Sequence, residues 1–276
     1  MDSDCYCWRC CEYSNRIQLY IICRYIAKSA TIIYILSLAI ADIAFLNVVV
    51  PLTLVDITSN DPELFEGAGR HFVEFFQTIT VHVTCLTLMV MTTDRYLAIV
   101  YPVKSLKWRT TKTSLKVSIG VWIVSAVLSM PVAHSYISYI SKVLVVMGLF
   151  LTTYGIPLLI ISIRYLKIIF VLYKRNKEML QKTGGTRTTK KTRRAVKMVA
   201  LLILLFAFSW GPIQVLIMWW TFYPNFTNYS ELLKVDIFAK TLSYANSCVN
   251  PFVYAFMNKK IRKALATKLK FKHGCV

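Results

Sequence analysis

The sequence predicts an all-helical membrane protein, from its hydropathy, the length of its apolar stretches and the placement of its charges. Hydrophobic residues make up 56% of the 276 residues and the mean hydropathy is positive, which is above the norm for soluble domains. A helix through a bilayer core about 30 Å thick takes roughly 20 apolar residues, and six stretches approach or exceed that length. Helices are expected because an open strand would leave its amides unpaired in lipid.

The six expected membrane spans are separated by polar or charged connections. They cover residues 30–55, 72–93, 117–133, 143–163, 198–222 and 237–257. After the last span, residues 258–270 are basic and amphipathic, and we expect them to form a helix on the cytoplasmic side. Residues 1–23 precede the first span as an atypical N-terminal segment. We expect a single transmembrane domain over residues 1–276.

The formal net charge of +20 at pH 7 is concentrated in three of the connections. Lysines and arginines crowd residues 104–112, 174–197 and 259–272, whereas the alternate connections carry acidic residues such as Asp56 and Glu63. Basic loops stay in the cytoplasm, so we expect these three segments to face inward. The charge then orients the chain and attracts membrane lipids with anionic headgroups. It does not indicate a nucleic-acid partner.

Two sequons lie in one of the outer connections, at Asn225 and Asn228, each followed two residues later by a threonine or a serine. They are consistent with lumenal exposure, and these two asparagines are the expected glycosylation sites. The N-terminus lacks a signal-peptide pattern, because the apolar run of residues 17–23 is too short and no small-residue cleavage site follows. We therefore expect the first span to direct insertion into the membrane.

A cysteine cluster near the N-terminus, formed by Cys5, Cys7, Cys10 and Cys11, invites a metal-binding interpretation. Structural zinc sites use two separated ligand pairs at set spacing, and no histidine accompanies this cluster. We expect no metal there, because cytoplasmic thiols beside a membrane are more often reduced or acylated. Cys275, near the C-terminus, is either a palmitoylation site or a plain terminal cysteine.

Polar motifs interrupt five of the apolar spans at matching depths. They are Asp42 after Ser37, Asp94-Arg95-Tyr96, Trp122, Phe206 with Trp210-Gly211-Pro212, and Asn246 with Asn250-Pro251 and Tyr254. In order and spacing the set resembles the rhodopsin-like (class A) G-protein-coupled receptors. The resemblance implies a class A receptor bundle in the plasma membrane, which couples an outer ligand to a heterotrimeric G protein. An enzyme is not expected, since the sequence has no Ser/His/Asp set, histidine-rich metal motif or glycine-rich phosphate loop.

The resemblance assigns an activation switch to residues at the inner ends and at the proline hinges of the spans. At rest Arg95 pairs with Asp94, and on activation it meets Tyr165 and Tyr254 and opens a cleft for the G protein. Prolines in membrane helices break a backbone hydrogen bond and create hinges. The residues alone leave open that Arg95 only snorkels to the interface and that the aromatic residues only pack in the core. The switch comprises Asp94, Arg95, Tyr96, Tyr165, Phe206, Trp210, Pro212, Asn250, Pro251 and Tyr254.

Asp42 lies about half-way through the first apolar span, where a charge is costly and needs a partner, a proton or an ion. In the family this position belongs to a sodium site, although the supporting asparagine of the family's first helix is absent here. The resemblance therefore implies a sodium ion as the one candidate cofactor. Its candidate ligands are Asp42, Thr84, Asn246, Ser247 and Asn250.

Residues 204–214 and 242–247 resemble the galanin, kisspeptin and allatostatin-A receptors. That resemblance implies a neuropeptide ligand. Gln77 stands where amine receptors carry an aspartate, so a small cationic amine is not expected. Lys240 could pair with an acidic group of the ligand or with Asp236 one turn away. The pocket candidates by position are Gln77, Thr78, Gln214, Ile217, Lys240 and Tyr244.

The chain departs from the family in two places. Residues 1–18 lack the pattern of the family's first helix, of which residues 19–23 resemble the last turn, so that helix is expected to be truncated. Arg70 stands where the family has an outer cysteine, and residues 134–142 contain no cysteine partner. Both departures leave open a non-signalling receptor that acts as a decoy or as a partner in a receptor heteromer. A six-span transporter or channel is the remaining alternative, although the sequence has no internal repeat.

Overall fold

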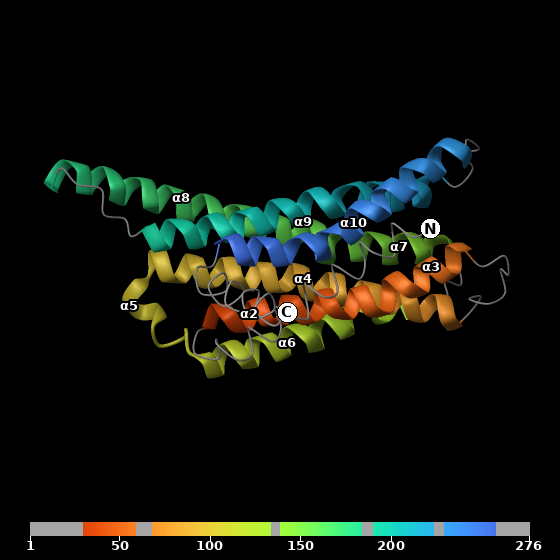
Figure 1. Ribbon diagram of the computed structural model, residues 1–276, viewed down its shortest axis with the longest axis horizontal. Helices are drawn as coiled ribbons and strands as arrows, with labels where there is room; N and C mark the ends of the chain where they lie inside the picture. Colours follow the sequence, from red (N-terminus) through yellow and green to blue (C-terminus); the bar gives the residue numbers. More distant parts are fainter. Residues whose placement is uncertain (1–29, 59–67, 134–138, 184–189, 224–228, 258–276) are drawn as a thin grey trace, which may run out of the picture.

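The computed structural model describes residues 30–58, 68–133, 139–183, 190–223 and 229–257, which form one bundle of helices (Figure 1). No strand occurs in these residues, so the predicted all-helical bundle is confirmed. The elements are α2 (Ala30–Ala44), the π-turn η1 (Phe45–Val49), α3 (Val50–Thr58), α4 (Ala68–Val100), α5 (Pro102–Ser105), α6 (Thr111–Ser129), the 3-10 turn η3 (Met130–Ala133), α7 (Tyr139–Phe150), the π-turn η4 (Leu151–Gly155), α8 (Ile156–Thr183), α9 (Lys190–Phe222) and α10 (Tyr229–Met257).

Several sequence predictions fall outside the described residues and stay predictions. They concern the N-terminal segment 1–23 with its four cysteines, the sequons at Asn225 and Asn228, the amphipathic segment 258–270, and Cys275. The backbone at Arg70, Pro251 and Tyr254 is helical, but the side chains of these three residues also lie outside the description.

Helices occupy all six of the expected membrane spans. Among the described residues, five helical segments are long and apolar enough to cross a bilayer, and they are Thr31–Val55, His71–Val100, Thr111–Val132, Ser141–Arg175 and Val196–Phe222. The sixth expected span lies in α10, a continuous helix of 29 residues. This helix is less apolar than the other five, because polar residues such as Asn246 and Asn250 interrupt it and face the bundle interior.

The long helix α4 lies at the centre of the bundle, where it contacts α2, α6, α8 and α9 (Figure 1). α5, the last turns of α8 and the first turns of α9 lie together at one end of the bundle, and they carry exposed basic residues such as Lys104, Lys174 and Lys197. The end of α3 and the start of α10 lie at the opposite end. The described parts of two of the three segments that the charge pattern predicts to be cytoplasmic, residues 104–112 and 174–197, therefore share one end of the bundle.

Two prolines explain why α2–α3 and α7–α8 each contain a π-turn. Pro51 follows η1 and Pro157 follows η4. A proline has no N–H to donate, and its ring collides with the carbonyl four residues earlier. Those carbonyls belong to Asn47 and Thr153, which lie inside the two π-turns, and the wider turn keeps the helix continuous past each proline. At Pro157, as at Pro51, the helix is therefore locally widened and stays continuous.

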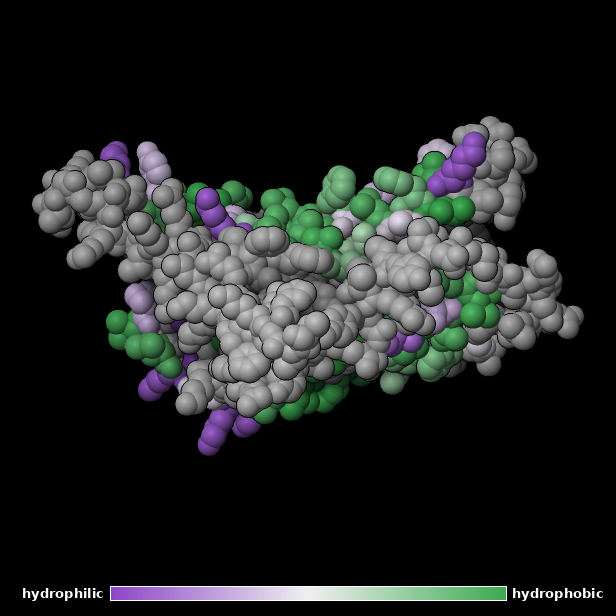
Figure 2. All heavy atoms as spheres, in the orientation of Figure 1, coloured by the Kyte–Doolittle hydropathy of each residue, from purple (hydrophilic) through white to green (hydrophobic). Residues whose placement is uncertain are grey.

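Small residues let α6 approach the centre of the bundle. Its buried residues recur every three or four positions and are Ser114, Ser118, Val121, Ser125 and Ser129. Small side chains at such intervals allow close helix packing in membranes. The opposite face of α6 is exposed and apolar, with Leu115, Ile119, Ile123 and Val127. On the face seen in Figure 2, apolar surface lies along the flanks of the bundle and hydrophilic side chains gather near its two ends, as expected for a protein surrounded by lipid.

Candidate functional site

The buried carboxylate of Asp42 lies where α2 and α10 meet. The residue is 1% exposed, and Asn250 Nδ2 donates to both of its carboxylate oxygens, at 3.3 and 3.0 Å. A carboxylate at this depth needs a partner, because lipid and packed side chains cannot solvate it. The contact joins residues 208 positions apart in the sequence and so ties α10 to α2.

The residues predicted to hold sodium gather around this pair. A small gap with no room for a water molecule is lined by Thr84, Asn246 and Asn250. Ser247, which follows Asn246 in the sequence, is also buried. Asn246 Oδ1 is buried and has no hydrogen-bond partner within the described residues. Carboxylate, amide and hydroxyl oxygens are suitable ligands for a hard cation. The donor set therefore fits sodium, whereas the gap is closed in this conformation.

An aromatic chain crosses the centre of the bundle from α10 to η4. Ring centroids are 5.2 Å apart for Tyr244 and Phe45, and 6.2 Å apart for Phe45 and Trp210. The centroids of Trp210 and Phe206 are 6.4 Å apart, as are those of Phe206 and Tyr154. These separations fall within the range of favourable aromatic pairs. The structure brings the predicted pair Phe206 and Trp210 together and adds Phe45 and Tyr154, which no motif in the sequence marks.

Tyr154 also braces the region of α9 that contains Pro212. Its hydroxyl donates to the carbonyl oxygen of Ala207 at 2.9 Å. A Cβ atom at Gly211 would lie 3.0 Å from the same hydroxyl, so the glycine leaves room for this contact. A rotation of α9 about Pro212 would therefore have to break or shift the hydrogen bond to η4.

The principal partner of Asp94 is Arg109, whereas Arg95, with which it was predicted to pair at rest, lies farther away. Arg109 lies between α5 and α6, and it donates from Nε to Asp94 Oδ1 at 2.7 Å and from Nη2 to Oδ2 at 3.1 Å. Arg95 Nη1 lies 4.0 Å from Asp94 Oδ2, at the limit of an ion pair. The two-point contact with Arg109 is stronger because a guanidinium matches a carboxylate in geometry. The predicted Asp94–Arg95 pair is therefore present at this longer distance, and Arg109 is a second and closer partner of the same carboxylate.

Arg95 and Tyr165, which the resemblance brings together on activation, have other partners here. Arg95 Nη2 donates to Thr31 Oγ1 of α2 at 2.7 Å. The Tyr165 hydroxyl donates to the carbonyl oxygen of Val196 in α9 at 3.5 Å. These contacts join the inner ends of α4 and α2, and of α8 and α9. In this state the described hydrogen bonds of Arg95 and Tyr165 go to Thr31 and Val196 and not to each other.

The predicted ligand-pocket residues come from three helices, α4, α9 and α10. Gln214 Nε2 donates to Thr153 Oγ1 at 3.5 Å, and the Tyr244 hydroxyl donates to Thr53 Oγ1 at 3.4 Å. Lys240 Nζ lies 2.8 Å from Asp236 Oδ2, which is the intrahelical alternative left open by the sequence. Thr78 bonds to a carbonyl of its own helix, and Ile217 is partly exposed.

His82 joins three helices and was missed by the motif search. It is fully buried, and its Nδ1 lies 3.0 Å from the Thr78 carbonyl oxygen and 3.1 Å from Ser129 Oγ in α6. Its Nε2 lies 3.1 Å from Thr152 Oγ1 in η4. Since a carbonyl only accepts, Nδ1 carries a proton. The one available signal was a histidine inside an apolar span, which is costly unless it has partners.

Comparisons with known proteins agree with the helical membrane bundle. Residues 14–254 match the family described as 7 transmembrane receptor (rhodopsin family). The chain is 33% identical to the G-protein coupled receptor 54 of Oreochromis niloticus over 93% of its length and 74% of that protein. It is 30% identical to the allatostatin-A receptor of Bombyx mori, with 86% and 70% covered, and 31% identical to the galanin receptor type 1 of Rattus norvegicus, with 86% and 71% covered.

Proposed function

Because the chain belongs to the rhodopsin family of seven-transmembrane receptors, we propose that it binds a neuropeptide at its outer face and activates a heterotrimeric G protein at its inner face. Its similarity to allatostatin-A and galanin receptors supports a peptide as the ligand. The observation that carries the mechanism is the aromatic chain. It links Tyr244, at the end of the bundle that carries the predicted pocket residues (the ligand end), through Phe45 to Trp210 and Phe206 near the proline of α9.

Peptide binding begins, in this proposal, with the polar residues of the ligand end. Lys240 is 40% exposed, whereas the side chain of Asp236, its (i, i+4) partner, is only 10% exposed. An acidic group of the peptide therefore has access to the Lys240 ammonium, and its contact must exceed the cost of leaving the buried Asp236 carboxylate with a weaker partner. Gln77 and Gln214 supply amide donors and acceptors for the peptide backbone or an amidated terminus, with Thr78, Ile217 and Tyr244 completing the pocket.

The signal passes through the centre of the bundle. A peptide that moves Tyr244 displaces Phe45, because their rings are in contact, and Phe45 is packed against Trp210. Trp210 and Phe206 then rotate with α9 about Pro212, and the Tyr154 hydrogen bond to Ala207 breaks. Since the core can repack only in discrete arrangements, the movement favours one of two states.

The inner end completes the switch. In the resting state Arg109 holds Asp94, and Arg95 is bound to Thr31. In the active state Arg95 leaves Thr31 for Tyr165 and Tyr254, and the separation of α9 from α4 admits the G protein. The G protein in turn tightens peptide binding, because coupling between two sites is reciprocal.

The sodium site and the covalent modifications belong to the same proposal. A sodium ion would be held by oxygens of Asp42, Thr84, Asn246 and Ser247, where its charge would neutralise the buried carboxylate. In that case Asn250, which now donates to Asp42, would exchange partners. Glycosylation at Asn225 and Asn228 and palmitoylation at Cys275 would place these residues at the outer and inner faces.

The test is a peptide screen in cells that express the full chain with a sensor of G-protein activation. At least one neuropeptide should produce a saturable response, and Arg95→Ala should abolish it at equal surface expression. Gln214→Ala should shift the dose dependence to higher peptide concentration, whereas Lys142→Gln, an exposed change on α7, should not. A peptide that binds the surface-expressed chain with high affinity but never activates a G protein would favour the non-signalling alternative.

A further inference from the structure

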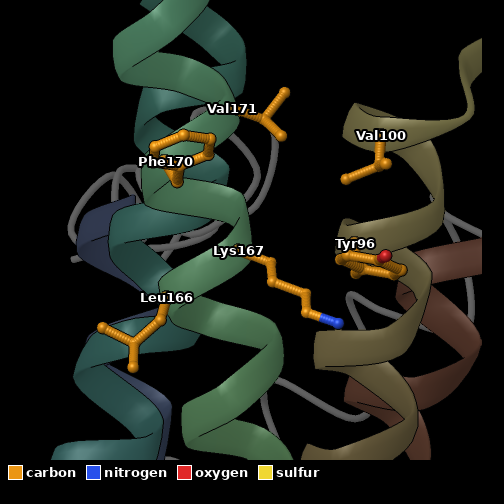
Figure 3. Close-up of a pocket in the computed structure, with 6 residues that line it drawn as sticks. All are labelled: Tyr96, Val100, Leu166, Lys167, Phe170 and Val171. Atoms are coloured by element: carbon orange, nitrogen blue, oxygen red, sulfur yellow. The ribbon is translucent and has the colours of Figure 1, made fainter.

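A groove of about 320 Å³ opens between the last turns of α4 and the middle of α8 (Figure 3). Its volume is at the lower end of the roughly 300–1,000 Å³ that is typical of ligand pockets. It is lined by Tyr96, Val100, Leu166, Lys167, Phe170 and Val171. Lys167 is the one charged residue in this lining, and the other five are apolar or aromatic.

The groove faces the surroundings of the bundle and not its interior. Next to the groove, α8 buries Ile168, which packs with Val196 of α9 and Ile99 of α4. Leu166 and Phe170 lie on the other side of the helix and are 66% and 68% exposed. In a membrane protein such exposed apolar side chains meet lipid tails. The occupant of the groove therefore arrives from the lipid side.

The depth of the groove corresponds to the headgroup region of the inner leaflet. On the two helices the first charged residues toward this end are Asp94 and Arg164, and Lys167 and Phe170 lie about one to two turns beyond Arg164. Further along α8, Lys174 and Arg175 are exposed at the end of the bundle that the charge pattern places in the cytoplasm.

Lys167 is placed to meet an anion in this groove. Its side chain extends from α8 across the gap toward Tyr96, with Val100 on the same side of the gap as Tyr96 (Figure 3). None of the lining residues is acidic, and within the described residues no carboxylate pairs with Lys167. An ammonium beside apolar side chains, at the level of lipid phosphates, is complementary to an anionic headgroup with an attached acyl chain.

We propose that the groove between α4 and α8 binds one phospholipid with an anionic headgroup from the inner leaflet. Its headgroup pairs with the Lys167 ammonium, and the first part of an acyl chain lies along Leu166 and Phe170. Because Tyr96 adjoins Asp94 and Arg95, the lipid would rest against the inner end of the switch. The proposal does not depend on the identity of the peptide or on signalling, so it can fail or succeed independently of the proposed function.

The test is native mass spectrometry of the full chain in detergent, with equimolar phosphatidylserine and phosphatidylcholine of matched acyl chains. The unmodified chain should retain more phosphatidylserine. Lys167→Gln should lower the bound ratio about fivefold, because it removes the one ammonium that pairs with the headgroup in the groove. Lys116→Gln is the matched control, since Lys116 is also exposed near the cytoplasmic start of a membrane helix, and it should leave the ratio unchanged.

A second variant separates the groove from general surface charge. Val100→Phe fills the groove while keeping Lys167, and it should also reduce retention of phosphatidylserine. Equal ratios for Lys167→Gln and the unmodified chain, or an equal loss with Lys116→Gln, would overturn the proposal. So would undiminished phosphatidylserine binding by the Val100→Phe variant.

Discussion

Replacing Arg109 by methionine should raise the ligand-free activity of the receptor about tenfold. Arg109 makes a two-point contact with Asp94, at 2.7 and 3.1 Å, from the connection between α5 and α6. In the proposed mechanism this contact belongs to the resting state. Its loss should therefore shift the equilibrium between the two states toward the active one.

The size of the shift follows from the burial of the pair. A hydrogen bond to a charged group contributes about 1.5–3 kcal/mol. The Arg109 side chain is 25% exposed and that of Asp94 is 6% exposed, so the lower value of about 1.5 kcal/mol is appropriate. Each 1.4 kcal/mol is about a tenfold change in an equilibrium constant. An active fraction of about 1%, within the usual range for a minor state, would rise to about 10%.

The assay is ligand-free G-protein activation in cells, divided by the amount of receptor at the surface. Lys107→Met removes another positive charge from the same connection and is the matched control, because Lys107 is exposed. Arg109→Lys, which keeps the charge but not the two-point geometry, should give an intermediate value. A fall in activity would mean that the released Asp94 holds Arg95 more tightly, and the reasoning would be refuted. An equal rise with Lys107→Met would refute it too.

Three further predictions concern the buried pair, the histidine and the ligand end. Asn250→Ala should lower the midpoint of thermal unfolding in detergent by several degrees, because Asp42 loses the Nδ2 group that donates to both of its carboxylate oxygens. An unchanged midpoint would show that another group satisfies the carboxylate. His82→Leu removes hydrogen bonds to α6 and η4, each worth about 0.6 kcal/mol in membrane proteins. The midpoint of thermal unfolding should therefore fall by roughly 2–4 °C. A rise in this midpoint would contradict the role of His82 in joining the helices. Lys240→Gln should weaken only peptides with an acidic group, measured by competition binding, and equal weakening of neutral peptides would count against the ion-pair exchange.

Hydropathy and motif spacing predicted the parts of the structure that follow from one-dimensional patterns. The apolar stretches coincide with helices because lipid leaves the backbone few alternatives. The family resemblance, and not a pattern in the chain, implied that Asp42 and Asn250 lie together, although 208 positions separate them. Phe206 and Trp210 lie one turn apart, so their contact follows from helix geometry.

The partners that the sequence did not reveal come from segments without a pattern. Arg109 lies in a connection where several basic residues are equivalent by composition, and only the fold selects it for Asp94. Phe45 and Tyr154 are ordinary aromatic residues within apolar stretches, and their role depends on how η1 and η4 turn their rings toward α9. His82 depends on partners from two other helices.

Reciprocity between the two faces is the most direct test of the central claim. The activating peptide from the screen would be titrated onto the purified chain in lipid nanodiscs, with and without its nucleotide-free G protein. The account predicts that the G protein tightens peptide binding about 5–150-fold, the usual range of coupling between sites. Identical peptide affinity in both titrations, with the G protein demonstrably bound, would contradict the claim that the outer and inner faces belong to one switch.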